Sequence, residues 1–210
     1  MINVYTVNMG ITKAKKYHHG DLEDALLGAG IREAKITGTK NLGVNSLAKE
    51  VNVSPMAVYR HFTNGESLRA SISQQAREEM AKRMLEAIAR ESGVRERFQA
   101  VGRAYIEFAL KEPGLFAVAF VACEGAPKRE DNPSAWLVFQ GSILDLCNAG
   151  LIKSNEVEQV GAFAWASVHG FATLASGNEP MRPKANEEVI ANLLDRIWSG
   201  IVQSNKEAKS

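Results

Sequence analysis

Residues 44–62 read VNSLAKEVNVSPMAVYRHF, and the rest of the chain is organised around this stretch. Its apolar residues recur at the three- and four-residue spacing of amphipathic helices. They form two stripes: Leu47, Ala48 and Val51, then Val58 and Phe62. We therefore expect two short helices that face one small core.

The residues between the two stripes predict a tight turn. Asn52 adopts a left-handed conformation more readily than most residues. Ser54 is a favourable N-cap, and Pro55 suits the first helical position, where its missing N–H costs nothing. The stretch is thus a helix-turn-helix pattern, although an ordinary helical hairpin in a core would show the same spacing.

The second helix of this pattern presents five side chains outward: Met56, Ala57, Tyr59, Arg60 and His61. In a DNA major groove these positions are contact residues. Arg60 can pair bidentately with guanine, or it can make only a phosphate contact. The spacing therefore fits a DNA reader and a core hairpin equally well.

Charge supports phosphate contact at the front of the chain, but weakly. The 210 residues carry 25 Lys and Arg against 24 Asp and Glu, whereas residues 1–65 hold eight basic and five acidic ones. A basic arm precedes the first helix: Lys13, Lys15, Lys16 and Tyr17. It is either a solvated tail or an arm that contacts phosphates or a minor groove.

Several function classes are disfavoured. Cys123 and Cys147 are too few for a disulfide framework, and no Cys/His spacing suggests zinc, so we expect no metal and no cofactor. The longest apolar run, 160–175, is shorter than the ~20 residues of a membrane span, and no signal peptide is recognisable. No catalytic spacing or glycine-rich phosphate loop points to an enzyme. We expect a cytoplasmic, non-enzymatic protein with no membrane partner.

Helical periodicity continues downstream and predicts an all-α chain of about nine helices. The first starts at Asp21. A long helix from Ser67 to about Glu91 places Leu85 on its apolar side, and a later helix places Trp136 on its inner side. Other helices are expected over residues 94–111, 115–121, 156–176 and from 189 onward, with a loop at 124–133. We predict a disordered N-terminus (1–12), a helix-turn-helix domain with its arm (13–66) and a helical effector-binding and dimerisation domain (67–205).

Two motifs resemble the TetR family of transcription regulators. The first comprises YHHGDL at residues 17–22 and YRHFTNGESL at 59–68. The second, WASVHGFATL at 165–174, is similar to the Trp-His-Gly signature of one C-terminal domain type in that family. The resemblance implies a homodimer that binds double-stranded palindromic operator DNA and is released by a small effector. A DNA-binding dimer without a small ligand, or an activator, are the alternatives.

The resemblance also implies roles for single residues. Tyr59 and His61 become phosphate contacts, and Met56, Ala57 and Arg60 become base readers. The full set expected at DNA is Lys13, Lys15, Lys16, Tyr17, Asn45, Ser54, Met56, Ala57, Tyr59, Arg60 and His61. The family usually has a lysine where this chain has Gly65. That phosphate contact is either missing or replaced by backbone N–H groups at the helix start.

The aromatic residues of the second domain are either ordinary core or the lining of a cavity for a mainly apolar effector. The candidates are Tyr105, Phe108, Phe116, Phe120, Cys123, Trp136, Phe139, Trp165 and His169. His169 either bonds a ligand or is a core histidine bonded to a neighbouring carbonyl. The last two helices are apolar enough to bury each other or to form a dimer seam with a second copy.

Overall fold

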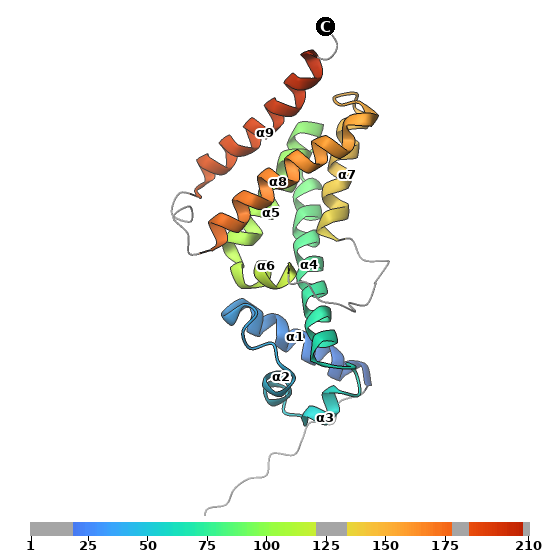
Figure 1. Ribbon diagram of the computed structural model, residues 1–210, viewed down its shortest axis with the longest axis vertical. Coiled ribbons are helices and arrows are strands. Elements are labelled where there is room, and N and C mark those ends of the chain that lie inside the picture. Colours follow the sequence, from blue (N-terminus) through green and yellow to red (C-terminus); the bar gives the residue numbers. More distant parts are fainter. Residues whose placement is uncertain (1–18, 121–133, 178–184, 208–210) are drawn as a thin grey trace, which may run out of the picture.

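The computed structural model describes residues 19–120, 134–177 and 185–207, which contain helices joined by turns and loops, and no strand (Figure 1). Nine α-helices follow one another in these ranges: α1 (His19–Thr37), α2 (Val44–Glu50), α3 (Pro55–Val58), α4 (Gly65–Ile88), α5 (Val94–Lys111), α6 (Pro113–Ala119), α7 (Ala135–Asn148), α8 (Val157–Ser176) and α9 (Glu187–Glu207). The predicted all-α class is confirmed. The basic arm, Cys123 and the expected loop at 124–133 lie outside the described residues.

The helices form two groups along the long axis of the molecule (Figure 1). We call the first group, α1 to α3 with the start of α4, the head, and the second, the rest of α4 with α5 to α9, the body. The continuous helix α4 contacts α1 at one end and α5, α6 and α7 further on. A rigid element therefore connects the two groups.

Short-range hydrogen bonds define the ends of α3. The Ser54 hydroxyl accepts from the Ala57 N–H at 3.3 Å, and Pro55 occupies the first helical position. Asn52 has a φ of 57°, the left-handed conformation expected for it. Val58 and Phe62 are buried in the head. The predicted turn and both apolar stripes are therefore present.

Helix α4 begins two residues earlier than predicted, because Asn64 and Ser67 cap it reciprocally. The Asn64 Oδ1 accepts from the Ser67 N–H at 2.8 Å, and the Ser67 Oγ accepts from the Asn64 N–H at 3.2 Å. This capping box satisfies two backbone donors that the first turn would otherwise leave unpaired. Gly65 thus becomes the first residue of the helix.

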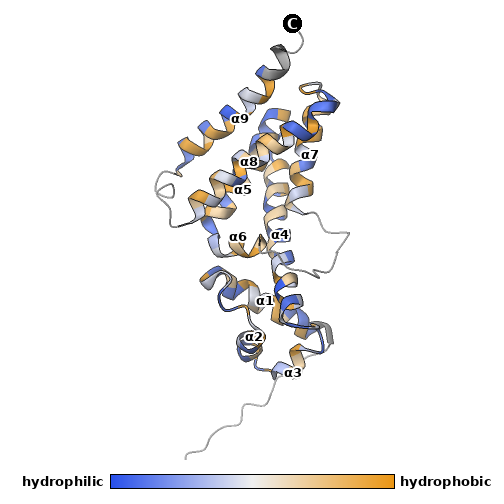
Figure 2. Cartoon of the chain, viewed as in Figure 1, coloured by the Kyte–Doolittle hydropathy of each residue, from blue (hydrophilic) through white to orange (hydrophobic). Residues whose placement is uncertain are grey.

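Two predicted burial assignments were wrong. Leu85 is 42% exposed, because it follows the fully buried Met84 by one residue and a helix turns about 100° per residue. Trp136 is 44% exposed at the first turn of α7, where it lies beside the core rather than within it. Figure 2 shows that polar and apolar residues alternate along most helices, so apolar type alone does not define the inward side.

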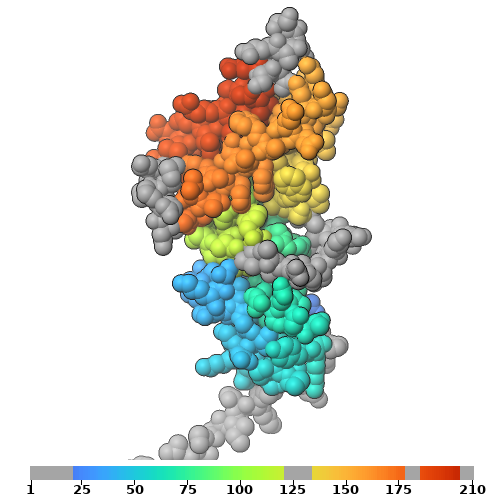
Figure 3. All heavy atoms as spheres, viewed as in Figure 1, coloured from blue at the N-terminus to red at the C-terminus, as the bar shows by residue number. Residues whose placement is uncertain are grey.

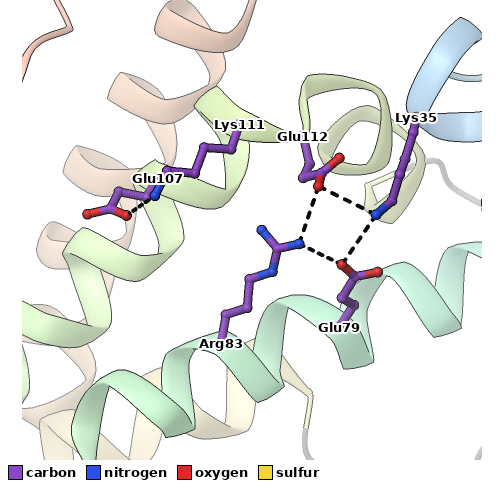
Figure 4. A network of polar contacts seen from close by, with 6 residues as sticks. All are labelled: Lys35, Glu79, Arg83, Glu107, Lys111 and Glu112. Carbon is purple, nitrogen blue, oxygen red and sulfur yellow. Dashed lines mark hydrogen bonds and ion pairs between the residues drawn. The ribbon is translucent and has the colours of Figure 1, made fainter. Parts of the chain in front are cut away.

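The head and the body meet where α1 packs on α6 (Figure 3). A Cβ added to Gly114 would overlap the backbone carbonyl oxygen of Ala34, so glycine permits this close approach. Beside it, Lys35 of α1 pairs with Glu79 at 3.7 Å and with Glu112 at 3.4 Å, and Arg83 contacts both carboxylates (Figure 4). These four charged residues, the junction ring, join α1, α4 and the α5–α6 connection.

The two C-terminal helices differ in the side chains that they leave exposed. On α8, Phe163 and Leu174 are half-exposed, with small residues such as Ala166 between them. The exposed positions of α9 are polar, while Ile190 and Leu194 are buried. None of the described helices combines the length and apolar character that a membrane crossing needs.

Candidate nucleic-acid interface and aromatic cluster

The short helix α3 and the turn after it lie at the far end of the head (Figure 1). Met56 is 67% exposed, and Tyr59 and Arg60 are also exposed. Asn45 on α2 and the capping Ser54 are accessible as well. Polar, aromatic and apolar side chains thus point outward on and beside α3, whose start is fixed by its N-cap. A helix that reads a DNA groove needs this arrangement.

Two predicted DNA contacts are less accessible. Ala57 is partly buried and packs against the core of the head. His61 is also partly buried. Met56 and Arg60, which are exposed, therefore offer more surface for base contact. The assignment of every one of these residues to DNA stays a prediction.

Arg69, an exposed residue one turn into α4, was not among the predicted DNA contacts. A Cβ at Gly65 would lie 3.5 Å from the Arg69 Nη1, so this guanidinium covers the position where a lysine was expected. Residues four apart share one helix side, and that spacing was the available signal. Arg69 therefore brings a positive charge back to the start of α4.

The body contains a cluster of aromatic rings drawn from four helices. Its members are Tyr105 of α5, Phe116 of α6, Phe120 directly after α6, Trp136 and Phe139 of α7, and Trp165 and His169 of α8. Tyr105 contacts Phe116, Phe120 and Trp165 with ring centroids 5.6, 6.3 and 5.2 Å apart. His169 stacks on Trp165 at 5.5 Å and an interplanar angle of 4°. Seven of the nine predicted pocket residues therefore lie together.

The other two pocket candidates are not part of this cluster as described. Phe108 is buried beside the junction ring, where the guanidinium of Arg83 lies 4.9 Å from its ring centroid. Cys123 lies outside the described residues. Residues three apart share one helix side, so helical spacing alone did not show that Phe108 contacts Arg83 of α4 and not the other rings.

Inside the cluster, the Tyr105 hydroxyl and the His169 Nδ1 form a hydrogen bond of 2.7 Å. The partner of His169 is thus a side chain and not the backbone carbonyl considered from the sequence. Burial raises the pKa of Tyr105 well above its usual value and lowers the pKa of His169. Both groups are therefore neutral at neutral pH, which avoids a charge among apolar rings.

A narrow space adjoins the cluster where Tyr105, Phe139 and Trp165 face residues of α4, α5, α8 and α9, and its volume is about 10 Å³. That is at the lower limit for a single water molecule. This space is therefore too small for an effector in this structure. The described residues also include no group of His, Cys, Asp and Glu side chains suited to a metal ion.

Comparison with protein families connects the body to known regulators. Residues 98–197 match the family model described as "Tetracyclin repressor-like, C-terminal domain". A search of curated protein sequences found no match. The match runs from within α5 to about the middle of α9 and includes every residue of the aromatic cluster.

Solved structures share the whole architecture. A protein of unknown function from Rhodococcus sp. RHA1 has a TM-score of 0.73 and 28% identity, over 89% of this chain and 98% of that one. A TetR family transcription regulator from Marinobacter aquaeolei VT8 has a TM-score of 0.62 and 19% identity, over 84% and 93%. The regulator FadR from Bacillus subtilis, solved with stearoyl-CoA, has a TM-score of 0.62 and 16% identity, over 84% and 98%.

The chain therefore has the fold of the TetR-family transcription regulators, a helix-turn-helix head on a helical body. Together with the match over residues 98–197, this fold supports assignment to the TetR family. The Trp-His-Gly subtype of the C-terminal domain stays a prediction.

Proposed function

We propose that this protein is a DNA-binding transcription regulator that binds a palindromic operator as a homodimer. The observation that carries the proposal is the capped helix α3, which presents Met56, Tyr59 and Arg60 at the exposed end of the head. Such side chains can reach base edges in a major groove while neighbouring groups hold the phosphates. Regulation, and not catalysis, is the activity that this arrangement suits.

The exposed apolar side of α8 supports the homodimer. Phe163 and Leu174 lie half-exposed on α8, and a Cβ at Gly200 of α9 would lie 3.7 Å from the Phe163 ring. Small neighbours such as Ala166 would let a second α8 approach closely. In a dimer joined at this surface, each of the two heads could bind one DNA half-site, with the half-sites about one helical turn apart.

We further propose that the protein is a repressor that a small, mainly apolar effector releases from DNA. Support comes from α6, which touches both the aromatic cluster and the head. Its Phe116 belongs to the cluster, whereas its Gly114 packs on Ala34 of α1. The Ala119 carbonyl accepts a hydrogen bond from the Arg77 Nη1 at 2.9 Å, so a movement of α6 would also displace α4.

An effector that separates the cluster rings would therefore shift α6, and with it α1 and α4. The effector acts only through its different affinities for the two arrangements, typically ~1–3 kcal/mol of coupling. A repressor then loses its operator because the two heads no longer match the half-site spacing.

Retardation of the DNA upstream of the protein's own gene, measured in a gel at low salt, tests the DNA proposal. Arg60→Ala should weaken binding by ~1–3 kcal/mol and relax one base position. Arg69→Ala should weaken all sequences alike and reduce the slope of log affinity against log salt by about 0.9. Arg90→Ala, beyond the far end of α4, is the charge-matched control. Absence of retardation by the wild type would refute the proposal.

A DNA-binding dimer without a ligand is the remaining alternative, and the small volume of the space beside Tyr105, Phe139 and Trp165 is the observation that favours it. A ligand that binds the folded protein raises its melting temperature in proportion to its concentration and affinity. A thermal-shift screen with apolar compounds therefore separates the two functions. No shift with any compound, together with intact DNA retardation, would favour the ligand-free regulator.

A further inference from the structure

The hydrogen bond between Tyr105 and His169 uses only one of the two ring nitrogens of His169. Tyr105 is 1% exposed and neutral, so its hydroxyl is a donor that needs an acceptor, and the His169 Nδ1 lies 2.7 Å away. A hydroxyl that donates to Nδ1 requires that nitrogen to be unprotonated. The neutral ring then carries its hydrogen on Nε2. Tyr105 thereby makes His169 an N–H donor.

This N–H is accessible from outside the cluster. His169 is only partly buried, and its Nε2 is not among the fully buried polar atoms without a partner in the described residues. Among the described residues His169 bonds Tyr105 through Nδ1, so its Nε2–H is left for another acceptor.

Two large rings of the cluster are partly exposed. The Phe120 ring is 41% exposed and its centroid lies 4.8 Å from that of His169, and Trp136 is 44% exposed with its ring centroid 5.2 Å from that of Trp165. Because Trp165 and His169 stack on each other, a ligand that stacks on either exposed ring lies beside that stacked pair. Flat aromatic molecules stack on such rings at favourable distances.

We propose that the cluster binds a planar aromatic molecule that carries a hydrogen-bond acceptor, and that the acceptor oxygen receives the His169 Nε2–H. The rings recognise the flat apolar part, and the histidine recognises the oxygen of a carboxylate or a ketone. This inference rests on the proposed control by an effector and specifies the chemical class of that effector.

A cationic ligand would use the same rings differently. Ammonium groups bind over aromatic faces, but they offer no acceptor to an N–H donor. A bound cation would need a carboxylate to neutralise it, but among the described residues no carboxylate forms a hydrogen bond with Tyr105 or His169. The donor at Nε2 therefore selects for an oxygen acceptor and against an ammonium group.

Four probes of one shape test this selection: naphthalene carboxylate, acetylnaphthalene, ethylnaphthalene and naphthylmethylammonium. Binding to the DNA-free, full-length protein is followed by tryptophan fluorescence in a Trp198→Phe background. Trp198 packs on Phe98 and Arg95 and not on the cluster, so the remaining signal comes from Trp136 and Trp165. The carboxylate and the ketone should each bind about three- to tenfold tighter than ethylnaphthalene, the increment of one net hydrogen bond.

Variants separate recognition from folding. His169→Phe should remove the preference for the two acceptor probes while ethylnaphthalene still binds. His169→Gln, which keeps an N–H donor, should retain part of the preference. Phe120→Ala should weaken all four probes, and it should lower the melting temperature less than Phe116→Ala, because Phe120 is 41% exposed and Phe116 is buried. If His169→Phe does not fold, the ranking of the probes on the Trp198→Phe protein decides alone.

Equal affinity for all four probes, tightest binding of the ammonium probe, or an unchanged preference in His169→Phe would each overturn the inference. DNA retardation is measured separately with the same preparations. Failure of ligand selection with intact retardation refutes only this inference, whereas loss of retardation refutes the proposed function.

Discussion

The head and the aromatic cluster are assembled in opposite ways. In the head, the turn, the caps and both apolar stripes come from residues 44–67, and the capping partners are three residues apart. In the cluster, Tyr105 and its hydrogen-bond partner His169 are 64 residues apart, and the rings come from four helices. The head is therefore set by local geometry, and the cluster by how helices pack on one another.

The largest effect is expected where local and tertiary preferences oppose each other, at Gly114. Helix propensity alone predicts that Gly114→Ala stabilises the protein by up to ~1 kcal/mol. The added Cβ would overlap the Ala34 carbonyl, a backbone atom, so we expect a net destabilisation of about 1–3 kcal/mol in urea unfolding. Gly141→Ala on α7, with no neighbouring atom within 4 Å, should instead stabilise by about 0.5–1 kcal/mol. Equal gains at both sites would show that the α1–α6 contact is unimportant.

The second effect tests the local construction of the head. Ser54→Ala removes the side chain that accepts from the Ala57 N–H and should cost ~1 kcal/mol of stability. DNA affinity should fall as well, because α3 loses its fixed start. Ser46→Ala, an exposed serine of α2, is the matched control and should change neither quantity. A Ser54→Ala protein as stable as this control would contradict the capping argument.

A smaller effect is expected at the junction ring. Lys35 contacts Glu79 and Glu112 with about a third of its side chain exposed, so Lys35→Ala should cost only ~0.2–1 kcal/mol. The loss should shrink as salt is added, because ions screen exposed pairs. Lys82→Ala, which removes a looser pair within α4, should cost less. A loss at Lys35 that salt leaves unchanged would indicate packing and not charge.

The smallest effect is the acid sensitivity contributed by His169. Burial lowers its pKa in the folded protein, so the unfolded chain binds the proton first as pH falls below about 6.5. Protonation therefore favours unfolding, and this part of the stability, complete above that pH, is lost on acidification. Urea unfolding at about pH 7.5 and about pH 5 should show a larger loss for the wild type than for His169→Gln. Equal losses would mean that His169 titrates normally.

Much of the head and of the helix order could be predicted from the sequence, because Asn52, Ser54 and Pro55 act on their immediate neighbours. Predictions that required the direction of a side chain were less successful. Leu85 and Trp136 were expected inside, yet both are more than 40% exposed. Arg69 was overlooked, since its importance comes from the missing side chain at Gly65, one turn away.

By itself, the sequence determined the helical class, the capped helix-turn-helix and the outward position of Met56 and Arg60. These features depend on spacing and hydrogen bonds within a few residues, which a linear chain already contains. Only the tertiary structure decided that seven of the predicted pocket residues share one cluster, that Tyr105 bonds His169, and that Gly114 lets α6 approach Ala34. Those contacts join residues far apart in the chain, so they arise only when packed helices bring them together.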